Sequence, residues 1–215
     1  MRKRIENLKG LATLRKNDQN CDFLAGNSMD DWTMVADAFI EIDSGLIHDF
    51  GSMSSCPQES SNMEIIDGTG RFMLPAFIDS HTHMVYANDR SDEFNMRMHG
   101  STYKEIADSG GGILNSSKQI TSSTEGQLLD SLLERIEKSR KTGTAALEIK
   151  SGYGLTAHSE RKMLSVIKKA KNQVPQQIWS TFLGAHTLPL KYNGNHDAYL
   201  KDCLLYTSPS PRDVS

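Results

Sequence analysis

The sequence predicts an α/β fold in which strands and helices alternate behind a small β layer. Between residues 74 and 203, short apolar runs bounded by turn residues alternate with segments whose apolar residues recur at helical spacing. Residues 1–73 instead offer short strand-like pieces separated by turn-rich stretches. Strands that alternate with helices of this length indicate βαβ units and a parallel sheet.

The first 73 residues are expected to form the N-terminal part of a small β-sandwich-type domain. Strand-like pieces occupy residues 33–42, 46–50 and 63–67, and a turn at 43–45 separates the first two. A segment rich in serine, proline and glutamine follows at 51–62. Nothing in this layer resembles a catalytic constellation.

From residue 74 onward, each predicted element has its own local signal. Thr124 and Gln127 have capping-box spacing in front of an apolar helical stripe, and Gly143 follows as a helix stop. The three glycines at 110–112 are expected to end the short helix before them. The expected order is a strand at 74–83, helices at 102–109 and about 124–141, a strand at 144–149, a helix at 157–171 and a strand at 178–183.

The most informative motif is LPAFIDSHTH, which ends the first of these strands with two histidines one residue apart. Side chains at i and i+2 of a strand point to the same face, so His81 and His83 can converge on one point. Two imidazoles at this spacing make half of a zinc-type site, which can leave a position open for water. The alternative is a histidine pair without a metal. The buried-type strand that stops at Asp79 and Ser80 favours the metal site.

Polar residues follow three predicted strands at the same end. His81 and His83, then Lys150 and Tyr153, and finally His186 lie at or just past the C-terminal end of a strand. In a β/α barrel this is the face that carries the catalytic groups. Taken singly, Tyr153 could be a loop residue and His186 a core histidine, but their shared position favours function. The sequence therefore predicts a partial (β/α)8 TIM-like barrel, the first half only.

Arg90 lies in the loop that follows the histidine pair. A guanidinium group can bind a carboxylate or phosphate through two parallel hydrogen bonds. On spacing alone, a surface arginine paired with Asp89, Asp92 or Glu93 is the favoured interpretation. The other histidines, at 48, 99, 158 and 196, are expected to be structural or surface residues.

Composition argues against several classes of protein. A net charge of -3 gives no electrostatic reason to bind nucleic acid or a membrane surface. Three widely spaced cysteines argue against a disulfide framework. The basic N-terminus has no apolar stretch of signal-peptide length, and no run of residues is long enough to cross a membrane. A cytoplasmic protein is therefore expected.

Longer stretches narrow the class of protein. PAFIDSHTH after a β layer resembles the metal-binding first strand of amidohydrolase-superfamily barrels. Residues 80–113, 147–170 and 180–189, which include GGGI, EIKSGYG and FLGAH, resemble imidazolonepropionase. The resemblance covers about residues 33–200. It implies hydrolytic ring opening of 4-imidazolone-5-propanoate to N-formimino-L-glutamate, a step in histidine degradation.

The resemblance also implies roles for individual residues. His81 and His83 match the first-strand ligands of one divalent metal, zinc or iron. Arg90 matches the arginine that holds the propionate of the substrate, and Tyr153 matches a substrate-binding tyrosine. His186 matches a histidine that contacts the ring at its carbonyl, where negative charge develops. A homodimer of full-length subunits is implied as well.

The sequence departs from this family in its length. A complete barrel needs about 250 residues, and the family's further metal histidine, proton-transfer glutamate and metal aspartate come from later strands. No role is assigned to Lys150, because the family is similar to the single-metal type. Residues 204–215, which contain TSPSPRD, look like translated adapter or vector sequence, so an artefact tail is expected. The chain alone is therefore expected to be a poorly folded and inactive fragment.

Three alternatives remain open. Another metal-dependent amidohydrolase, such as a deaminase or a dihydropyrimidinase-like enzyme, would share the metal strand but take a different substrate. A non-catalytic amidohydrolase-like scaffold would keep the barrel, although the intact pair of His81 and His83 argues against it. The third is a genuine short form with a regulatory role that pairs with full-length subunits.

Overall fold

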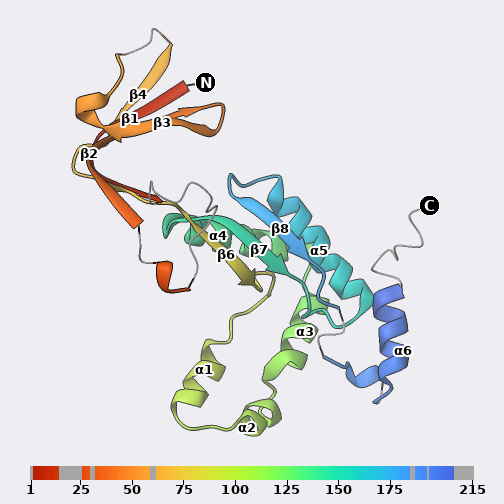
Figure 1. Ribbon diagram of the computed structural model, residues 1–215. Coiled ribbons are helices and arrows are strands. Elements are labelled where there is room, and N and C mark those ends of the chain that lie inside the picture. Colours follow the sequence, from red (N-terminus) through yellow and green to blue (C-terminus); the bar gives the residue numbers. More distant parts are fainter. Residues whose placement is uncertain are drawn as a thin grey trace. The chain divides into compact units, whose positions relative to one another are not determined.

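The computed structural model describes residues 2–14, 26–29, 32–58, 62–184, 187–192 and 194–205. The chain divides into two compact units, Met1–Pro75 and Ala76–Ser215. Figure 1 shows their helices and strands coloured along the sequence. Within the described ranges, no helix combines the length and the apolar character that a membrane crossing requires.

The first unit is built on one five-stranded sheet in the order β3-β2-β1-β4, with β5 also paired to β1. The predicted strands at 33–42, 46–50 and 63–67 correspond to β2, β3 and β4. The described residues of this unit form this single sheet and do not include the second sheet of the predicted sandwich. The strands are β1 Arg2–Leu14, β2 Trp32–Asp43, β3 Leu46–Ser52, β4 Met63–Asp67 and β5 Phe72–Met73, with 3-10 turns at Gly26–Ser28 and Met53–Ser55.

Strand β1 is an element that the sequence pattern did not predict. It pairs antiparallel with β2, and its register shifts between Ile5 and Leu8. Asn7 lies in this interval with a positive φ of 58°, as expected for a β-bulge that bends the strand. The bulge breaks the two-residue alternation of apolar side chains, and so removes the usual strand signal. The small core of this unit consists of Leu8, Leu11, Ala38 and Ile40.

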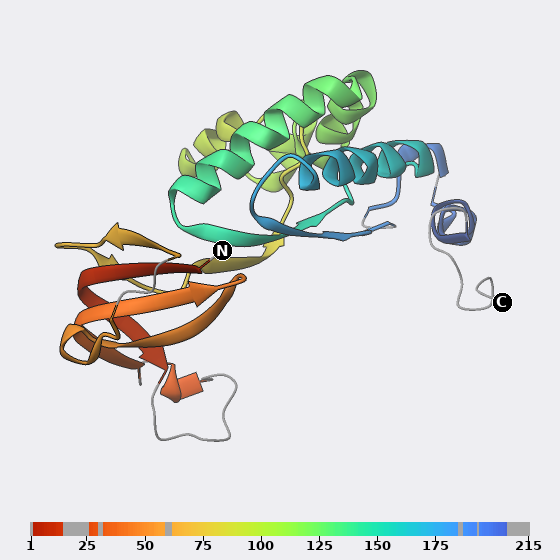
Figure 2. The same ribbon diagram turned by 90° about the horizontal axis from the view of Figure 1, so that it is seen from above.

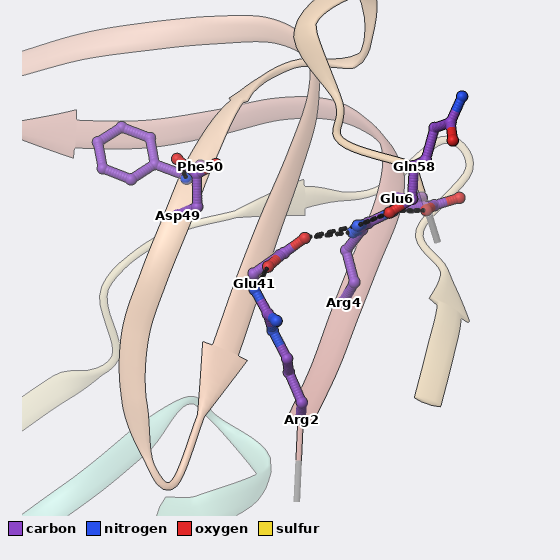
Figure 3. A network of polar contacts seen from close by, with 7 residues as sticks. All are labelled: Arg2, Arg4, Glu6, Glu41, Asp49, Phe50 and Gln58. Atoms are coloured by element: carbon purple, nitrogen blue, oxygen red, sulfur yellow. Dashed lines mark hydrogen bonds and ion pairs between the residues drawn. The ribbon is translucent and has the colours of Figure 1, made fainter. Parts of the chain in front are cut away.

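A buried ion pair links β1 to β2 (Figure 3). Arg4 and Glu41 are each 1% exposed, and Arg4 Nε donates to Glu41 Oε1 over 2.7 Å. Arg2 Nη2 donates to the other oxygen, Oε2, also over 2.7 Å, and Arg4 Nη1 lies 3.1 Å from Glu6 Oε1. Burial by itself raises the pKa of Glu41, but the hydrogen bonds from Arg4 and Arg2 outweigh burial and lower it. The Glu41 carboxylate is therefore held between the buried Arg4 and the partly exposed Arg2.

The second unit contains three parallel strands in the order β6-β7-β8. The predicted parallel arrangement is therefore confirmed, and helix α5 has the bounds that the periodicity predicts. The elements are β6 Phe77–Thr82, α1 Ser91–Met98, α2 Tyr103–Asp108, α3 Gly112–Ser122, α4 Glu125–Lys141, β7 Thr144–Lys150, α5 Ala157–Lys171, β8 Gln177–Thr181, a 3-10 turn at Leu190–Tyr192, α6 His196–Leu200 and a π-helical turn at Lys201–Leu205.

Helices α3, α4 and α5 cover one face of this sheet (Figure 2). Thr124 and Gln127 form the predicted capping box at the start of α4. Leu147 and Ile149 of β7 are buried among the apolar faces of these helices. The main core consists of Val85, Ile120, Leu128, Leu132, Ile136, Leu147, Ile149, Met163, Val166, Ile167, Ala170 and Ile178.

Two expectations about this unit were wrong, and helix α3 was not predicted. The strand that ends in the histidine pair was expected to be buried, yet Phe77 and Ile78 of β6 are 69% and 71% exposed. Strand β6 pairs with β7 on one side, and the described residues contain no closed barrel that would cover it. The glycines at 110–112 do end α2, but Gly112 also begins α3. The loop expected to follow the histidines contains helix α1.

Candidate active site

The predicted metal ligands lie together at the end of β6. The ring centres of His81 and His83 are 5.6 Å apart, with an angle of 67° between the ring planes. Thr82 between them donates its Oγ1 hydrogen to the carbonyl of Glu148 over 2.8 Å, which ties this end of β6 to β7. Two imidazoles on one tetrahedral zinc, with metal–nitrogen bonds of about 2.0 Å, have ring centres roughly 5 Å apart. The histidine pair therefore fits a shared metal ion.

The described ranges supply only part of a metal site. Among them, no group of three or more His, Cys, Asp or Glu side chains is placed to hold an ion. A stable site for zinc needs three or four protein ligands. His81 and His83 could supply two of these, so the remaining ligands must come from other residues.

Tyr153 lies directly against His83. Its ring stacks on that of His83, with ring centres 4.7 Å apart and an angle of 22° between the planes. Tyr153 belongs to the loop between β7 and α5, whereas His83 follows β6. The stacking therefore joins the ends of two neighbouring parallel strands, as the shared position of the polar residues predicted.

A pocket of about 240 Å³ opens beside this stack. Three residues singled out in the sequence, His83, Arg90 and Tyr153, line it together. The other lining residues were not predicted, because they carry no motif of their own. They are Tyr86, Asn88, Asp89 and Ser116.

Arg90 forms an ion pair with Glu93, one of the partners expected for a surface arginine. Arg90 Nε donates to Glu93 Oε2 over 2.8 Å, and Nη2 contacts the same oxygen. Glu93 Oε1 accepts from the backbone N–H of Gly112 over 2.8 Å. The hydrogen bond with Glu93 raises the pKa of Arg90, and the bond with Arg90 lowers the pKa of Glu93. Glu93 therefore fixes a permanently charged guanidinium at the pocket wall.

A second carboxylate, Glu148 on β7, lies near the histidine pair and was missed in the sequence. Its Oε1 accepts from both Lys150 Nζ and Thr181 Oγ1. The hydrogen bonds from Lys150 and Thr181 are the main causes of a lowered pKa of Glu148. Its position two residues before Lys150, on the same face of β7, was the available signal. His186, the predicted carbonyl contact, lies outside the described residues.

A histidine pair at the end of a strand, beside a pocket on a parallel α/β unit, is the arrangement that the resemblance to amidohydrolase barrels predicts. Solved structures agree at the level of the fold. A triazine hydrolase from Arthobacter aurescens matches 84% of this chain and 35% of its own, with a TM-score of 0.59 and 18% identity. Guanine deaminase from E. coli matches 94% of this chain and 42% of its own, with a TM-score of 0.57 and 11% identity. A mutant of the atrazine chlorohydrolase TrzN from Arthrobacter aurescens TC1, solved in complex with zinc and atraton, has a TM-score of 0.52 and 16% identity over 97% of this chain and 44% of its own.

Sequence comparison identifies which enzymes this chain is related to. The chain is 44% identical to the imidazolonepropionase of Flavobacterium psychrophilum over 93% of its length, and 42% identical to that of Flavobacterium johnsoniae over 95%. The chain is thus a relative of imidazolonepropionase, and the predicted resemblance is confirmed. It spans 48% and 49% of these two proteins, about half their length. No protein-family model matches the sequence.

Proposed function

We propose that this chain forms the first half of an imidazolonepropionase, which hydrolyses 4-imidazolone-5-propanoate to N-formimino-L-glutamate. The observation that carries the proposal is the pocket that brings His83, Arg90 and Tyr153 together. A small anionic heterocycle can bind to a site that combines an aromatic ring, a fixed cation and a side chain able to bind a metal. Tyr153, Arg90 and His83 supply these three features. The identity to imidazolonepropionases over most of the chain supports the same substrate.

In this proposal His81 and His83 hold one divalent metal, zinc or iron. Bound there, the metal would supply Lewis-acid chemistry to the ring carbonyl and to water. The ring separation of 5.6 Å supports a shared ion, and a zinc-bound structural neighbour is consistent with it. The remaining ligands would come from the half of the protein that corresponds to the rest of the relatives' length.

The other pocket residues orient the substrate. Arg90 binds the propionate carboxylate with its guanidinium, which Glu93 holds through Nε and Nη2. Tyr153 contacts the imidazolone ring from the loop after β7. With its two ends held in this way, the substrate presents its ring carbonyl to the histidine pair. His186 is proposed to contact that carbonyl as negative charge develops.

The fold proposed for the whole protein is a (β/α)8 barrel in which β6, β7 and β8 are the first three strands. The exposed apolar side chains of Phe77, Ile78 and Trp179 support this proposal, because strands of a parallel sheet are normally covered on both faces. A cytoplasmic homodimer that binds a small molecule, and neither nucleic acid nor membrane, completes the proposal.

The test is a turnover assay on the full-length protein that carries this chain. The metal-loaded protein should convert 4-imidazolone-5-propanoate to N-formimino-L-glutamate, identified by mass spectrometry. His81→Ala should abolish turnover and reduce the bound metal. His99→Ala is a matched control, because His99 is exposed and bonds the carbonyl of Asn95 over 2.7 Å. Absence of this product with the metal-loaded wild-type protein would refute the proposed function.

A further inference from the structure

Glu160, in the first turn of α5, is an acidic side chain with 0% exposure. Its Oε2 accepts from the backbone N–H of Gly152 over 2.7 Å, and its Oε1 accepts from the backbone N–H of Leu155 over 2.8 Å. Burial of a carboxylate is costly unless hydrogen bonds to the charged group compensate. Helix α5 does not need Glu160 as its cap, because the side chain of Thr156 already accepts from Ser159 N. The buried carboxylate therefore stabilises the loop between β7 and α5.

The loop held by Glu160 has an unusual backbone conformation and is closely packed. Gly152 and Leu155 have φ values of 113° and 59°, in the left-handed region that side chains rarely adopt. A Cβ on Gly154 would lie 2.6 Å from the backbone N of Glu160. Ser117 Oγ also donates to the Gly154 carbonyl over 2.9 Å. Backbone strain of this kind persists only where surrounding contacts over-determine it.

Tyr153 lies between the two amides that Glu160 binds. Its ring stacks on His83 at 4.7 Å and lines the pocket together with Arg90. Glu160 is not among the residues that line this pocket. The two amides bonded to Glu160 connect its carboxylate to the pocket through the loop. The two amides it fixes flank the one side chain of that loop that enters the candidate site.

We propose that Glu160 is a positioning residue that holds Tyr153 in its place against His83. The inference rests on the proposed function, in which Tyr153 contacts the substrate ring. Loss of a contact that is made equally in the ground state and the transition state raises KM and leaves kcat nearly unchanged. Loss of Glu160 should therefore raise KM more than it lowers kcat.

The test is Glu160→Gln in the full-length protein. Glutamine keeps the size of the side chain but offers one acceptor oxygen, so one of the two backbone amides faces an NH2 group. We expect KM for 4-imidazolone-5-propanoate to rise roughly tenfold, with a smaller change in kcat. Amide hydrogen exchange should accelerate at Gly152 or Leu155. Glu134→Gln, on the exposed surface of α4 in an ion pair with Lys138, is the matched control and should change neither quantity.

A double-mutant cycle separates positioning from general stability. In a Tyr153→Ala background, Glu160→Gln should cause little further rise in KM, because the two changes act through the same contact. An equal rise in KM in both backgrounds, or unchanged exchange at both amides, would overturn the proposal. Glu160→Asp, one methylene too short to reach both amides, should give the same pattern if the glutamine variant does not fold.

The exchange measurement does not depend on turnover. If the wild-type protein does not hydrolyse the substrate, the proposed function fails. Accelerated amide exchange in Glu160→Gln would still show that the carboxylate holds the loop. Unchanged amide exchange would refute the positioning role whether or not the protein hydrolyses the substrate.

Discussion

His83 and Tyr153 stack with ring centres 4.7 Å apart, so the strand of the candidate metal site and the loop of the proposed substrate contact meet at one point. Aromatic neighbours of this kind restrict the orientation of an imidazole, and groups around a metal ligand tune its affinity. If His83 binds the metal as proposed, the stack couples metal binding to the position of a residue that lines the pocket.

Removal of the Tyr153 ring should weaken both metal and substrate binding. We expect Tyr153→Ala to lower zinc affinity roughly tenfold, because His83 loses its stacking partner. Tyr153→Phe preserves the ring and should retain the metal affinity of the wild type. A competition titration with a zinc chelator measures both variants. Equal affinities for the alanine and phenylalanine variants would show that the stack does not orient His83.

Arg90 should contribute to substrate binding more than to chemistry. Lysine keeps the charge but cannot offer the planar pair of donors, so we expect Arg90→Lys to raise KM roughly 10- to 100-fold with kcat nearly unchanged. Arg97→Lys, on the exposed part of α1, serves as the control. Steady-state kinetics decide the matter. An unchanged KM in Arg90→Lys would show that Arg90 pairs with Glu93 on the surface and does not bind the substrate.

The buried ion pair of the β unit should be sensitive to the loss of one partner. Arg4→Met leaves Glu41 buried with Arg2 alone, and we expect a loss of about 3–5 kcal/mol in the free energy of unfolding. Lys3→Met removes an exposed pair with Glu64 and should cost about 0–1 kcal/mol. Urea unfolding compares the two. Similar losses in the free energy of unfolding in both variants would show that the buried pair of Arg4 and Glu41 stabilises the fold no more than the exposed pair does.

The same pair predicts a pH dependence of stability. The hydrogen bonds from Arg4 and Arg2 hold the pKa of Glu41 below 4.5, so the unfolded chain binds more protons there than the folded chain. Its stabilisation is therefore fully present above about pH 5 and is lost as the pH falls through the folded pKa. In Glu41→Gln this part of the acid sensitivity should disappear. Thermal unfolding between pH 3 and about pH 7 would reveal it, and a profile identical to that of the wild type would contradict it.

Sequence patterns predicted the parts of the fold that depend on local chemistry. The capping box of Thr124 and Gln127, the extent of α5 and the parallel strands that flank it all follow from side-chain spacing. The convergence of His81 and His83 follows from the two-residue period of a strand.

The parts that were missed depend on contacts between distant segments or on side chains that bind backbone amides. Strand β1 contains a bulge and a buried Arg4, whose partner Glu41 lies on another strand. Glu160 binds two backbone amides, and Glu93 binds Gly112 across 19 residues. Backbone donors have no signature in the sequence, so carboxylates that bind them look like ordinary surface residues.

The most direct test of the account compares two substrates in the full-length, metal-loaded protein. One is 4-imidazolone-5-propanoate, and the other is the same imidazolone ring without the propanoate arm. If Arg90 and Tyr153 bind the two ends of the substrate beside the histidine pair, kcat/KM should be at least roughly 100-fold higher for the first, and Arg90→Lys should remove most of the difference. Equal kcat/KM values for the two compounds in the wild-type protein would contradict the account.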